Sequence, residues 1–559
     1  MIKELSPIAK RVFIETDCAI IGGGLAGCTA ALELAESGFL VDVFVKRHLI
    51  EDSNSYYIAG GLAVVPDDKY SNDSIQHHVQ DTLNAGRGLN NETIVSWCLK
   101  HFYPDVIQYL SGKGVLFDRI NKQYELNREG GHSAERIIHK GDTTGEEMMT
   151  ILGHRLINHQ NIRIHEHHLA IDLIRKNKLK RGRGQDECLG FYVYNIKDNE
   201  VKTVHCKGTF IATGGLGKVF LYTSNSDTST GDGFAMAYRA GLPLVNMEFI
   251  QFHPTVYYDP CAQTETERRF LLTEALRGAG AILTLTKDSH QDFVKKYDPK
   301  GSQATRDVVV LAEDIEMRKH GLFHVWLNCT SIGKQRLQQE FPQTWEFCNS
   351  KGIDPSKEPI PVVYAAHYSN GGVQVNATGE TTLKRCYIIG ETAYTGLHGA
   401  TRLAGNSAPE CVFFARQAAH HFKSRDDEPS SIHVPRWDEG KSIESKDKIT
   451  VGFYWENIRR TMNALCGISR NNDRLTAAQH LLSSLKTSIN SYYWQYHVDK
   501  DFLEVRNIAD VANIITESAL MRKESRAAHY REDYPKQDDR HFKKLIVIQK
   551  NRKPFFQKP

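Results

Sequence analysis

The sequence lacks any pair of cysteines at the C-x-x-C spacing, although eleven cysteines are scattered over its 559 residues. This argues against a disulfide framework, a zinc ribbon or a set of iron–sulfur ligands within the chain. Free thiols are typical of a reducing compartment, so we expect a cytoplasmic protein.

Long apolar runs are also missing. No 18-residue apolar span occurs, and the first stretch, MIKELSPIAKRVFIETD, has no continuous apolar segment of the kind that a secretory signal carries. We therefore expect neither export nor a membrane anchor. The net charge of +3 is too small to predict nucleic-acid or membrane binding. After Leu520, twelve Lys and Arg face five Asp and Glu, which we interpret as a solvated helical end and tail.

What the chain does contain begins with a glycine-rich turn. Residues 18–21 predict a buried strand, and Gly22, Gly24 and Gly27 follow at the G-x-G-x-x-G spacing. An Ala- and Leu-rich run up to Ser37 predicts a helix that Gly38 ends. This order brings backbone N–H groups and a helix N-terminus against a pyrophosphate, so it predicts dinucleotide binding in a Rossmann-like α/β domain.

The strand predicted over residues 39–45 lacks an acid at its end. Nicotinamide-binding domains, and many flavin ones, place Asp or Glu there to hold ribose hydroxyls. Here Val45 is followed by Lys46 and Arg47, which weakens assignment to NAD and makes Lys46 a candidate nucleotide contact.

Several polar segments follow. Residues 53–65, with Gly60 and Gly61, fit either a loop passing close to a flat ring system or a surface turn. Residues 128–145 are dense in charge, His and Gly, which favours an active-site loop over a solvated one. His165, His167 and His168 lie in a predicted strand region, where neighbours point to opposite faces, so we expect no metal site.

The domain organisation follows from changes in composition along the chain, since glycine-rich segments typical of nucleotide binding stop near residue 246 and return after residue 360. We expect a cofactor-binding domain over residues 1–245 and 361–425, split by an inserted α+β capping domain over residues 246–360. Residues 426–559 form a C-terminal helical domain and tail, with helices predicted over 455–466, 476–493 and 502–521.

Seven motifs carry a resemblance to a known family. They are REGGHSAERIIH (128–139), MEFIQFHPT (247–255), LLTEALRGAGA (271–281), ATRDVV (304–309), AAHY (365–368), GLHGATRL (396–403) and MRKESRAAHYREDYP (521–535). Through them the chain resembles the L-aspartate oxidases of the succinate dehydrogenase and fumarate reductase flavoprotein superfamily. The resemblance implies FAD bound across both cofactor segments and oxidation of L-aspartate to iminoaspartate. That reaction is the first step of de novo NAD biosynthesis through quinolinate, with oxygen or fumarate reoxidising the flavin and iminoaspartate passing to quinolinate synthase.

The resemblance also implies the cofactor contacts. These are Gly22, Gly23, Gly24, Leu25, Ala26, Gly27, Lys46, Asn54, Ser55, Tyr56, Tyr57, Ile58, Ala59, Gly60, Gly61, Leu169, Ala170, Asp232, Glu391, Ser407 and Ala408. Respiratory relatives carry, where Asn54 stands, a histidine that bonds covalently to FAD. We therefore expect non-covalent FAD here.

The substrate residues follow from the same motifs. Arg402 is the expected carboxylate clamp, since a guanidinium forks onto both oxygens. His253, His367 and Thr273 are expected to donate hydrogen bonds, and Glu129 to face the substrate amine. Arg306 is the family's candidate acid/base. Because an arginine pKa normally lies above about 12, we expect Arg306 mainly to neutralise the β-carboxylate while the neutral amine reacts.

Two alternatives remain at this point. One is a soluble fumarate reductase acting on dicarboxylates without an amine, and the other is a catalytically inactive FAD-binding module. Thr401, Ala279 and Ala59 depart from the family pattern and leave room for a diverged substrate. Glu129 and Asn54 favour the oxidase over the respiratory relatives.

Overall fold

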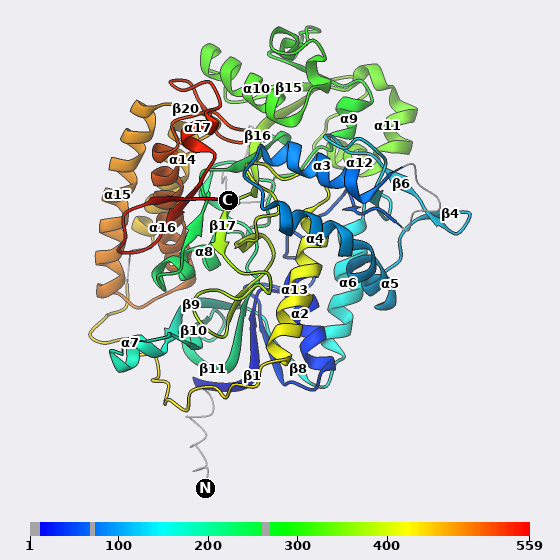
Figure 1. Ribbon diagram of the computed structural model, residues 1–559. Helices are drawn as coiled ribbons and strands as arrows, with labels where there is room; N and C mark the ends of the chain where they lie inside the picture. Colours follow the sequence, from blue (N-terminus) through cyan, green and yellow to red (C-terminus); the bar gives the residue numbers. More distant parts are fainter. Residues whose placement is uncertain (1–11, 67–72, 183, 260–268, 446) are drawn as a thin grey trace.

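The largest sheet lies beside the glycine-rich turn, at the bottom of Figure 1. Its strands run in the order β8-β2-β1-β11-β10-β9, with β18 also paired to β11. The bounds are Phe13–Ile21 (β1), Val41–Phe44 (β2), Ile162–His165 (β8), His168–Arg175 (β9), Cys188–Asn195 (β10), Glu200–Ile211 (β11) and Cys386–Ile388 (β18). β8, β2, β1, β11 and β18 are parallel neighbours, whereas β9, β10 and β11 pair antiparallel. The carboxyl ends of β1, β2 and β11 therefore meet at one edge, where open α/β sheets bind ligands.

Helix α2 (Leu25–Glu36) follows the first strand as the sequence predicts. Ala and Leu favour the helical conformation, and ten of its residues are buried. Gly24 is its N-cap, and the chain leaves the helix through Ser37 and Gly38, whose φ is +93°. α2 packs on α13 (Ser407–Lys423) and α6 (Thr144–Ile157), which cover one face of the sheet.

A small antiparallel sheet and a group of helices lie next to α13. Their bounds are Leu62–Ala63 (β3), Leu126–Asn127 (β6), Ile137–Ile138 (β7), Ile75–Gly86 (α3), Glu92–Phe102 (α4) and Gln108–Gly112 (α5). β7 pairs with both β3 and β6, so the segment from 126 to 138 is fixed against the segment around residue 62.

The inserted segment and the strand that follows it form a second sheet in the order β13-β16-β15-β14, shown in green at the top of Figure 1. The elements of this region are Ile250–Tyr257 (β13), Ala275–Gly278 (α9), Ile282–Thr284 (β14), Arg306–His320 (α10), Val325–Asn328 (β15), Lys334–Glu340 (α11), Pro342–Ser350 (α12) and Ile360–Ser369 (β16). β16 begins where the second cofactor segment is predicted to start, and it pairs with β13.

Three helices form the orange and red layer at the left of Figure 1. They are α14 (Ile449–Leu465), α15 (Asn472–Gln495) and α16 (Lys500–Met521), which confirms the three helices that periodicity predicts. α16 packs on α8 (Asp232–Arg239), beside the main sheet. Val309 of α10 and Ile508 of α16 belong to one cluster of buried apolar side chains, which ties the inserted segment to the helical layer.

The prediction of a solvated tail after Leu520 is wrong. Residues Leu545–Ile548 (β22) and Phe555–Gln557 (β23) add to a sheet with Leu244–Val245 (β12), Gly372–Gln374 (β17) and Ala393–Tyr394 (β19), in the order β19-β17-β12-β22-β23. Arg522 is fully buried, with its Nε 2.5 Å from Oε1 of the equally buried Glu248. Arg526 is likewise buried against Glu524. These basic residues are inside because carboxylates pair with them there.

The computed structural model describes residues 12–66, 73–182, 184–259, 269–445 and 447–559. The predicted absence of an export signal rests partly on residues 1–11, which lie outside these ranges, as does Cys261. The ten cysteines within the described ranges are free thiols. No helix among the described residues is both long and apolar enough to cross a bilayer.

Candidate active site

A cavity of about 920 Å³, its open mouth included, opens at the carboxyl ends of β1, β2 and β11. Twelve of the residues that the sequence predicts as cofactor contacts line it. They are Gly22, Gly23, Gly24, Leu25, Ala26, Lys46, Asn54, Ser55, Leu169, Ala170, Asp232 and Glu391. The cavity thus draws on both segments of the sequence that were expected to bind one cofactor.

The glycine turn fits a dinucleotide closely. A Cβ on Gly22, whose φ is +112°, would lie 2.1 Å from the carbonyl oxygen of Ala212. A Cβ on Gly27 would lie 2.0 Å from the carbonyl oxygen of Gly22. Neither Gly22 nor Gly27 therefore has room for a side chain. The N-cap Gly24 brings no side chain to the first turn of α2, which leaves its start suited to bind phosphate.

Lys46 lines the cavity, as expected of a candidate nucleotide contact that follows the second strand. Two carboxylates hold its ammonium group. Its Nζ lies 2.8 Å from Oδ2 of Asp232 and 2.9 Å from Oε1 of Glu504. Burial disfavours its charge, but the two carboxylates outweigh burial and raise the Lys46 pKa. Lys46 therefore stays charged and links the cavity wall to α16.

Asn54 makes a hydrogen bond within the protein from each end of its amide. Its Nδ2 donates to Oγ of Ser229 at 3.1 Å, and its Oδ1 accepts from the Ser226 backbone N–H at 2.6 Å. The amide thus clamps the 53–55 loop to the segment before α8. An amide in this position offers no nucleophile for a covalent bond to a flavin.

Nine predicted cofactor contacts do not line this cavity. They are Gly27, Tyr56, Tyr57, Ile58, Ala59, Gly60, Gly61, Ser407 and Ala408. Gly60 instead lies against the next cluster, since a Cβ there would be 2.3 Å from Oε1 of Glu129. The cavity also uses residues that were not predicted, among them Ala212, Thr213, Gly214, Thr228, Ser229 and Cys411. The apolar strand running into glycines at 210–217 was the signal for the first three.

Beyond Gly60, the inserted segment contributes a charged cluster. Arg306 is the first residue of α10, and its Nη2 lies 2.7 Å from Oε2 of Glu274. The other oxygen of Glu274 lies 3.0 Å from Nη2 of the buried Arg277. Burial opposes ionisation of Glu274, but the two guanidinium groups prevail and lower its pKa. Arg306, Glu274 and Arg277 therefore form a continuous ionic row. Glu274 and Arg277 were inside a recognised motif but were not predicted as site residues.

Arg402 is held rigidly from several sides. Its Nη1 donates to Oγ of Ser407 at 2.8 Å and its Nη2 to Oε1 of Gln251 at 3.2 Å. The guanidinium lies over the Tyr368 ring, 4.6 Å from its centroid. Its Nε is buried without a hydrogen-bond partner among the described residues. Burial and the charge of Arg306 lower the Arg402 pKa. These features suit a buried cation that awaits an anionic ligand.

His253 and His367 lie together, with ring centroids 5.5 Å apart. The Thr255 backbone N–H donates to Nδ1 of His253 at 3.2 Å, which places the proton of the neutral ring on Nε2. Nδ1 of His367 lies 2.7 Å from the Ser224 hydroxyl. Burial first, and then the charge of Arg306, hold the pKa of both histidines well below its usual range. Both rings are therefore neutral hydrogen-bonding groups near neutral pH.

Glu129 completes the cluster from the loop between β6 and β7. Burial raises its pKa, against the opposing charges of Arg306 and Arg402. Thr273 stands next to Glu274, and its hydroxyl accepts from the Ala275 backbone N–H at 3.4 Å. The structure thus brings Glu129, Arg306, Arg402, His253 and His367 into one electrostatic neighbourhood, with Thr273 in the adjoining turn.

The three histidines at 165–168 do not act together. Nε2 of His165 lies 2.5 Å from Oδ1 of the buried Asp42, and its ring stacks on Phe44. His168 is buried, with Nδ1 donating to the Glu166 carbonyl oxygen at 2.7 Å. His167 lies in the turn between β8 and β9, with its ring against that of His48.

Comparison with known proteins gives consistent matches. A model of the FAD binding domain matches residues 17–408, and one of the fumarate reductase flavoprotein C-term matches residues 455–557. L-aspartate oxidase 1 of Ralstonia nicotianae is 43% identical over 523 residues, covering 93% of this chain and 95% of that protein. L-aspartate oxidase of Pseudomonas aeruginosa is 42% identical over 528 residues, covering 93% and 95%. The structure of an E. coli quinol fumarate reductase has a TM-score of 0.84 at 25% identity, covering 98% of this chain and 97% of that one.

Proposed function

The chain belongs to the L-aspartate oxidase family, and from that premise we propose that it oxidises L-aspartate to iminoaspartate with FAD, the first step of de novo NAD biosynthesis. One observation carries the proposal. Two cationic guanidinium groups, Arg306 and Arg402, share a buried neighbourhood with the carboxyl group of Glu129. A substrate with two carboxylates and one amine complements that set of charges.

The arginines bind and orient the substrate. Arg402, fixed by Ser407 and Gln251, forks onto one carboxylate, and Arg306 neutralises the other. His253 donates from Nε2 to a carboxylate oxygen, and His367 and Thr273 add further hydrogen bonds. Because both rings are neutral, they add hydrogen bonds without repelling the arginines. Bound FAD supplies the two-electron acceptor for the hydride that leaves the substrate Cα.

Glu129 receives the substrate amine. Burial raises its pKa, so its carboxylate is a better proton acceptor than an exposed one. It stands on the loop beside Gly60, and this proximity supports a position for the substrate amine on the side of the cofactor loop. A substrate without an amine has no use for this group.

The cofactor is held without a covalent bond. Asn54 supplies an amide, which is already hydrogen-bonded to the backbone of Ser226 and the hydroxyl of Ser229. We take the twenty-one residues predicted from the motifs as the FAD-binding set. Residues 1–245 and 361–425 form the FAD-binding unit, 246–360 the cap and 426–559 the helical domain. Oxygen or fumarate reoxidises the flavin.

The chemistry of the product indicates a downstream enzyme, and the free thiols indicate a cellular compartment. Iminoaspartate hydrolyses in water, so we place quinolinate synthase downstream as the acceptor that consumes it. The ten free cysteines among the described residues suit the reducing cytoplasm.

Reduction of fumarate is the second candidate. The row from Arg306 through Glu274 to Arg277 is a path by which Arg306 regains a proton after giving one to a carbanion. The complete set of charged residues argues against an inactive FAD-binding module.

Anaerobic bleaching of the flavin tests the proposal. L-aspartate added to the purified enzyme without oxygen should remove the flavin absorbance, and succinate at the same concentration should not. Bleaching by succinate alone would contradict the proposal and favour the second candidate. Bleaching by neither compound would favour the inactive module.

A further inference from the structure

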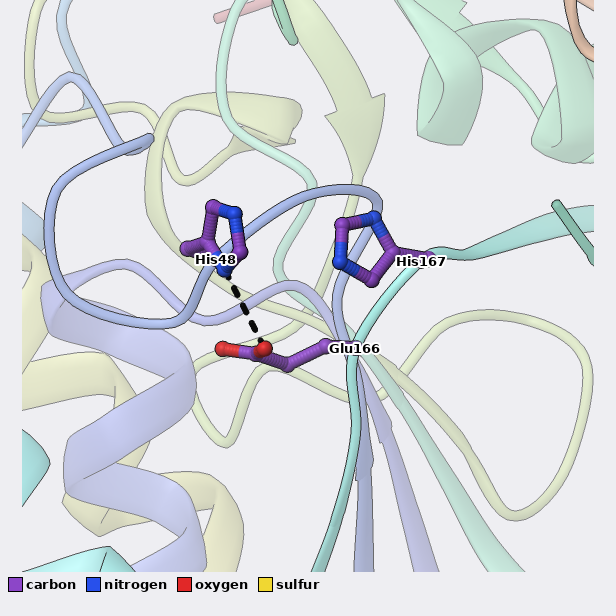
Figure 2. Close-up of side chains that lie close together, drawn as sticks. All are labelled: His48, Glu166 and His167. Carbon is purple, nitrogen blue, oxygen red and sulfur yellow. Dashed lines mark hydrogen bonds and ion pairs between the residues drawn. The ribbon is translucent and has the colours of Figure 1, made fainter. Parts of the chain in front are cut away.

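A second cluster of ligand-type side chains lies at the rim of the cofactor cavity (Figure 2). It contains His48, Glu166 and His167, whose potential ligand atoms all lie within 4.8 Å of one another. Nδ1 of His48 is 3.2 Å from Oε2 of Glu166. The two imidazole rings stand at 88° to each other, with centroids 4.9 Å apart.

The backbone directs His167 toward this cluster. Its φ of +59° is left-handed, which is uncommon for a residue other than glycine. It follows β8 and precedes β9, so the rings of His165 and His168 turn onto Phe44 while the ring of His167 faces His48. Figure 2 shows all three side chains converging on one point from two separate segments. The left-handed conformation of His167 thus brings a second imidazole to the pair formed by His48 and Glu166.

We propose that His48, Glu166 and His167 bind a divalent transition-metal ion of the zinc class. Two imidazoles and one carboxylate are the donor set that Zn²⁺ takes, with water completing a tetrahedron. Zinc–ligand bonds of about 2.0–2.2 Å require ligand atoms roughly 3.3 Å apart. His48 and Glu166 already meet that separation, and small rotations of partly exposed side chains bring the third ligand in.

The rest of the surface shows what an ordinary histidine–carboxylate pair looks like. His541 and Asp538 lie 2.7 Å apart, and their side chains are 62% and 38% exposed. His48 and Glu166 are 60% and 38% exposed. The two pairs are thus matched in exposure, but only the second gains another histidine among the described residues.

The cluster adjoins the cofactor cavity, so a metal ion bound there can affect how firmly the cofactor is held. His48 and Leu49 line the cofactor cavity, and Oε1 of Glu166 accepts a hydrogen bond from the Leu49 backbone N–H at 3.0 Å. A metal ion on this cluster therefore ties the β8–β9 turn to the cavity wall. We expect it to slow the loss of the bound cofactor.

Equilibrium dialysis of the holoenzyme against ZnCl₂, with metal analysis, tests the proposal. The informative variants are His48→Gln, whose amide can still bond Glu166, and His167→Asn, since asparagine tolerates the left-handed conformation. Each should bind one equivalent of Zn²⁺ less than the unaltered enzyme, whereas His541→Ala should bind as much. Circular dichroism confirms that the variants are folded.

The rate of flavin release provides a readout independent of turnover. Zn²⁺ should slow the rise of free-flavin fluorescence in the unaltered enzyme and in His541→Ala, but not in the two site variants. Equal zinc stoichiometry in all four proteins would overturn the site itself. Loss of one equivalent without any effect on flavin release would overturn its coupling to the cofactor.

Discussion

Arg306 and Glu274 form a close ion pair in which Nη2 of the arginine lies 2.7 Å from Oε2 of the carboxylate. The pair faces the site from the start of α10 and fixes the guanidinium before substrate arrives. The carboxylate of Glu274 holds the Arg306 guanidinium in place in the absence of substrate. A substrate carboxylate can then take the place of Glu274 as the partner of Arg306.

Replacing Arg306 with Gln should lower kcat for aspartate oxidation by at least about a hundredfold, as the loss of a positioned charge or proton donor does. Arg306→Lys keeps the charge but loses the fork, and should retain more activity than the glutamine variant. Steady-state kinetics with aspartate and with fumarate make the comparison. Full aspartate turnover in Arg306→Gln would remove any central role for this residue.

Arg402→Lys should raise KM for aspartate by roughly tenfold to a hundredfold, because one charge-assisted hydrogen bond is worth about 1.5–3 kcal/mol. Lysine cannot bond Ser407 and Gln251 together while also reaching the substrate. An unchanged KM would show that the clamp lies elsewhere.

Glu129→Gln should discriminate between the two candidate reactions. Loss of the carboxylate should reduce kcat/KM for aspartate by about tenfold or more, the value of a charged hydrogen bond. Fumarate reduction should change little, since fumarate has no amine. Equal losses for both substrates would refute the assignment of Glu129 to the amine.

His132 should contribute to acid lability. Its Nε2 donates to the Ala404 carbonyl oxygen at 2.8 Å, and its Nδ1 accepts from Nη1 of Arg136 at 3.0 Å. Burial, with the nearby Arg136, lowers the His132 pKa to about 4. The neutral His132 therefore adds its full contribution to the free energy of unfolding above about pH 6.5. This contribution, about 3 kcal/mol, is lost as the pH falls toward 4.

Urea unfolding at a series of pH values measures that contribution. Gln at position 132 can make both hydrogen bonds without titrating, so His132→Gln should lose less stability between pH 6.5 and 4. Identical pH profiles for the two proteins would contradict the assignment.

Gly22→Ala should abolish FAD binding, because its Cβ would lie 2.1 Å from the Ala212 carbonyl oxygen. Gly38→Ala is the matched control. Both glycines have a positive φ, but apart from its chain neighbours no described residue has an atom within 4 Å of a Cβ on Gly38. Flavin content after gel filtration should fall only in the first variant. Equal flavin loss in both would assign the effect to backbone strain.

The sequence was sufficient wherever the physical cause is local. The turn from Gly22 to Gly27, the helix that follows and the three later helices all depend on nearest neighbours. The resemblance to the L-aspartate oxidases, drawn from motifs, is confirmed by relatives of 43% and 42% identity. Those motifs also contain every predicted substrate residue.

Contacts between segments far apart in the chain could not be predicted from the sequence. Arg522 was interpreted as solvated because its buried partner Glu248 lies 274 positions earlier. His167 was judged against its immediate neighbours, whereas His48, the ring that it meets, comes from the loop after β2. In both cases the deciding partner is supplied by the fold and leaves no mark in the local pattern.

The pairing of β12 with β22 has a consequence for biosynthesis. The Ile546 backbone N–H bonds Oδ1 of Asn246 across 300 positions of chain. During translation the edge of β12 stays unpaired until residues 545–548 have been made, so the nascent protein carries an open strand edge for most of its synthesis. The sheet that contains β12 is therefore completed only when translation has nearly ended.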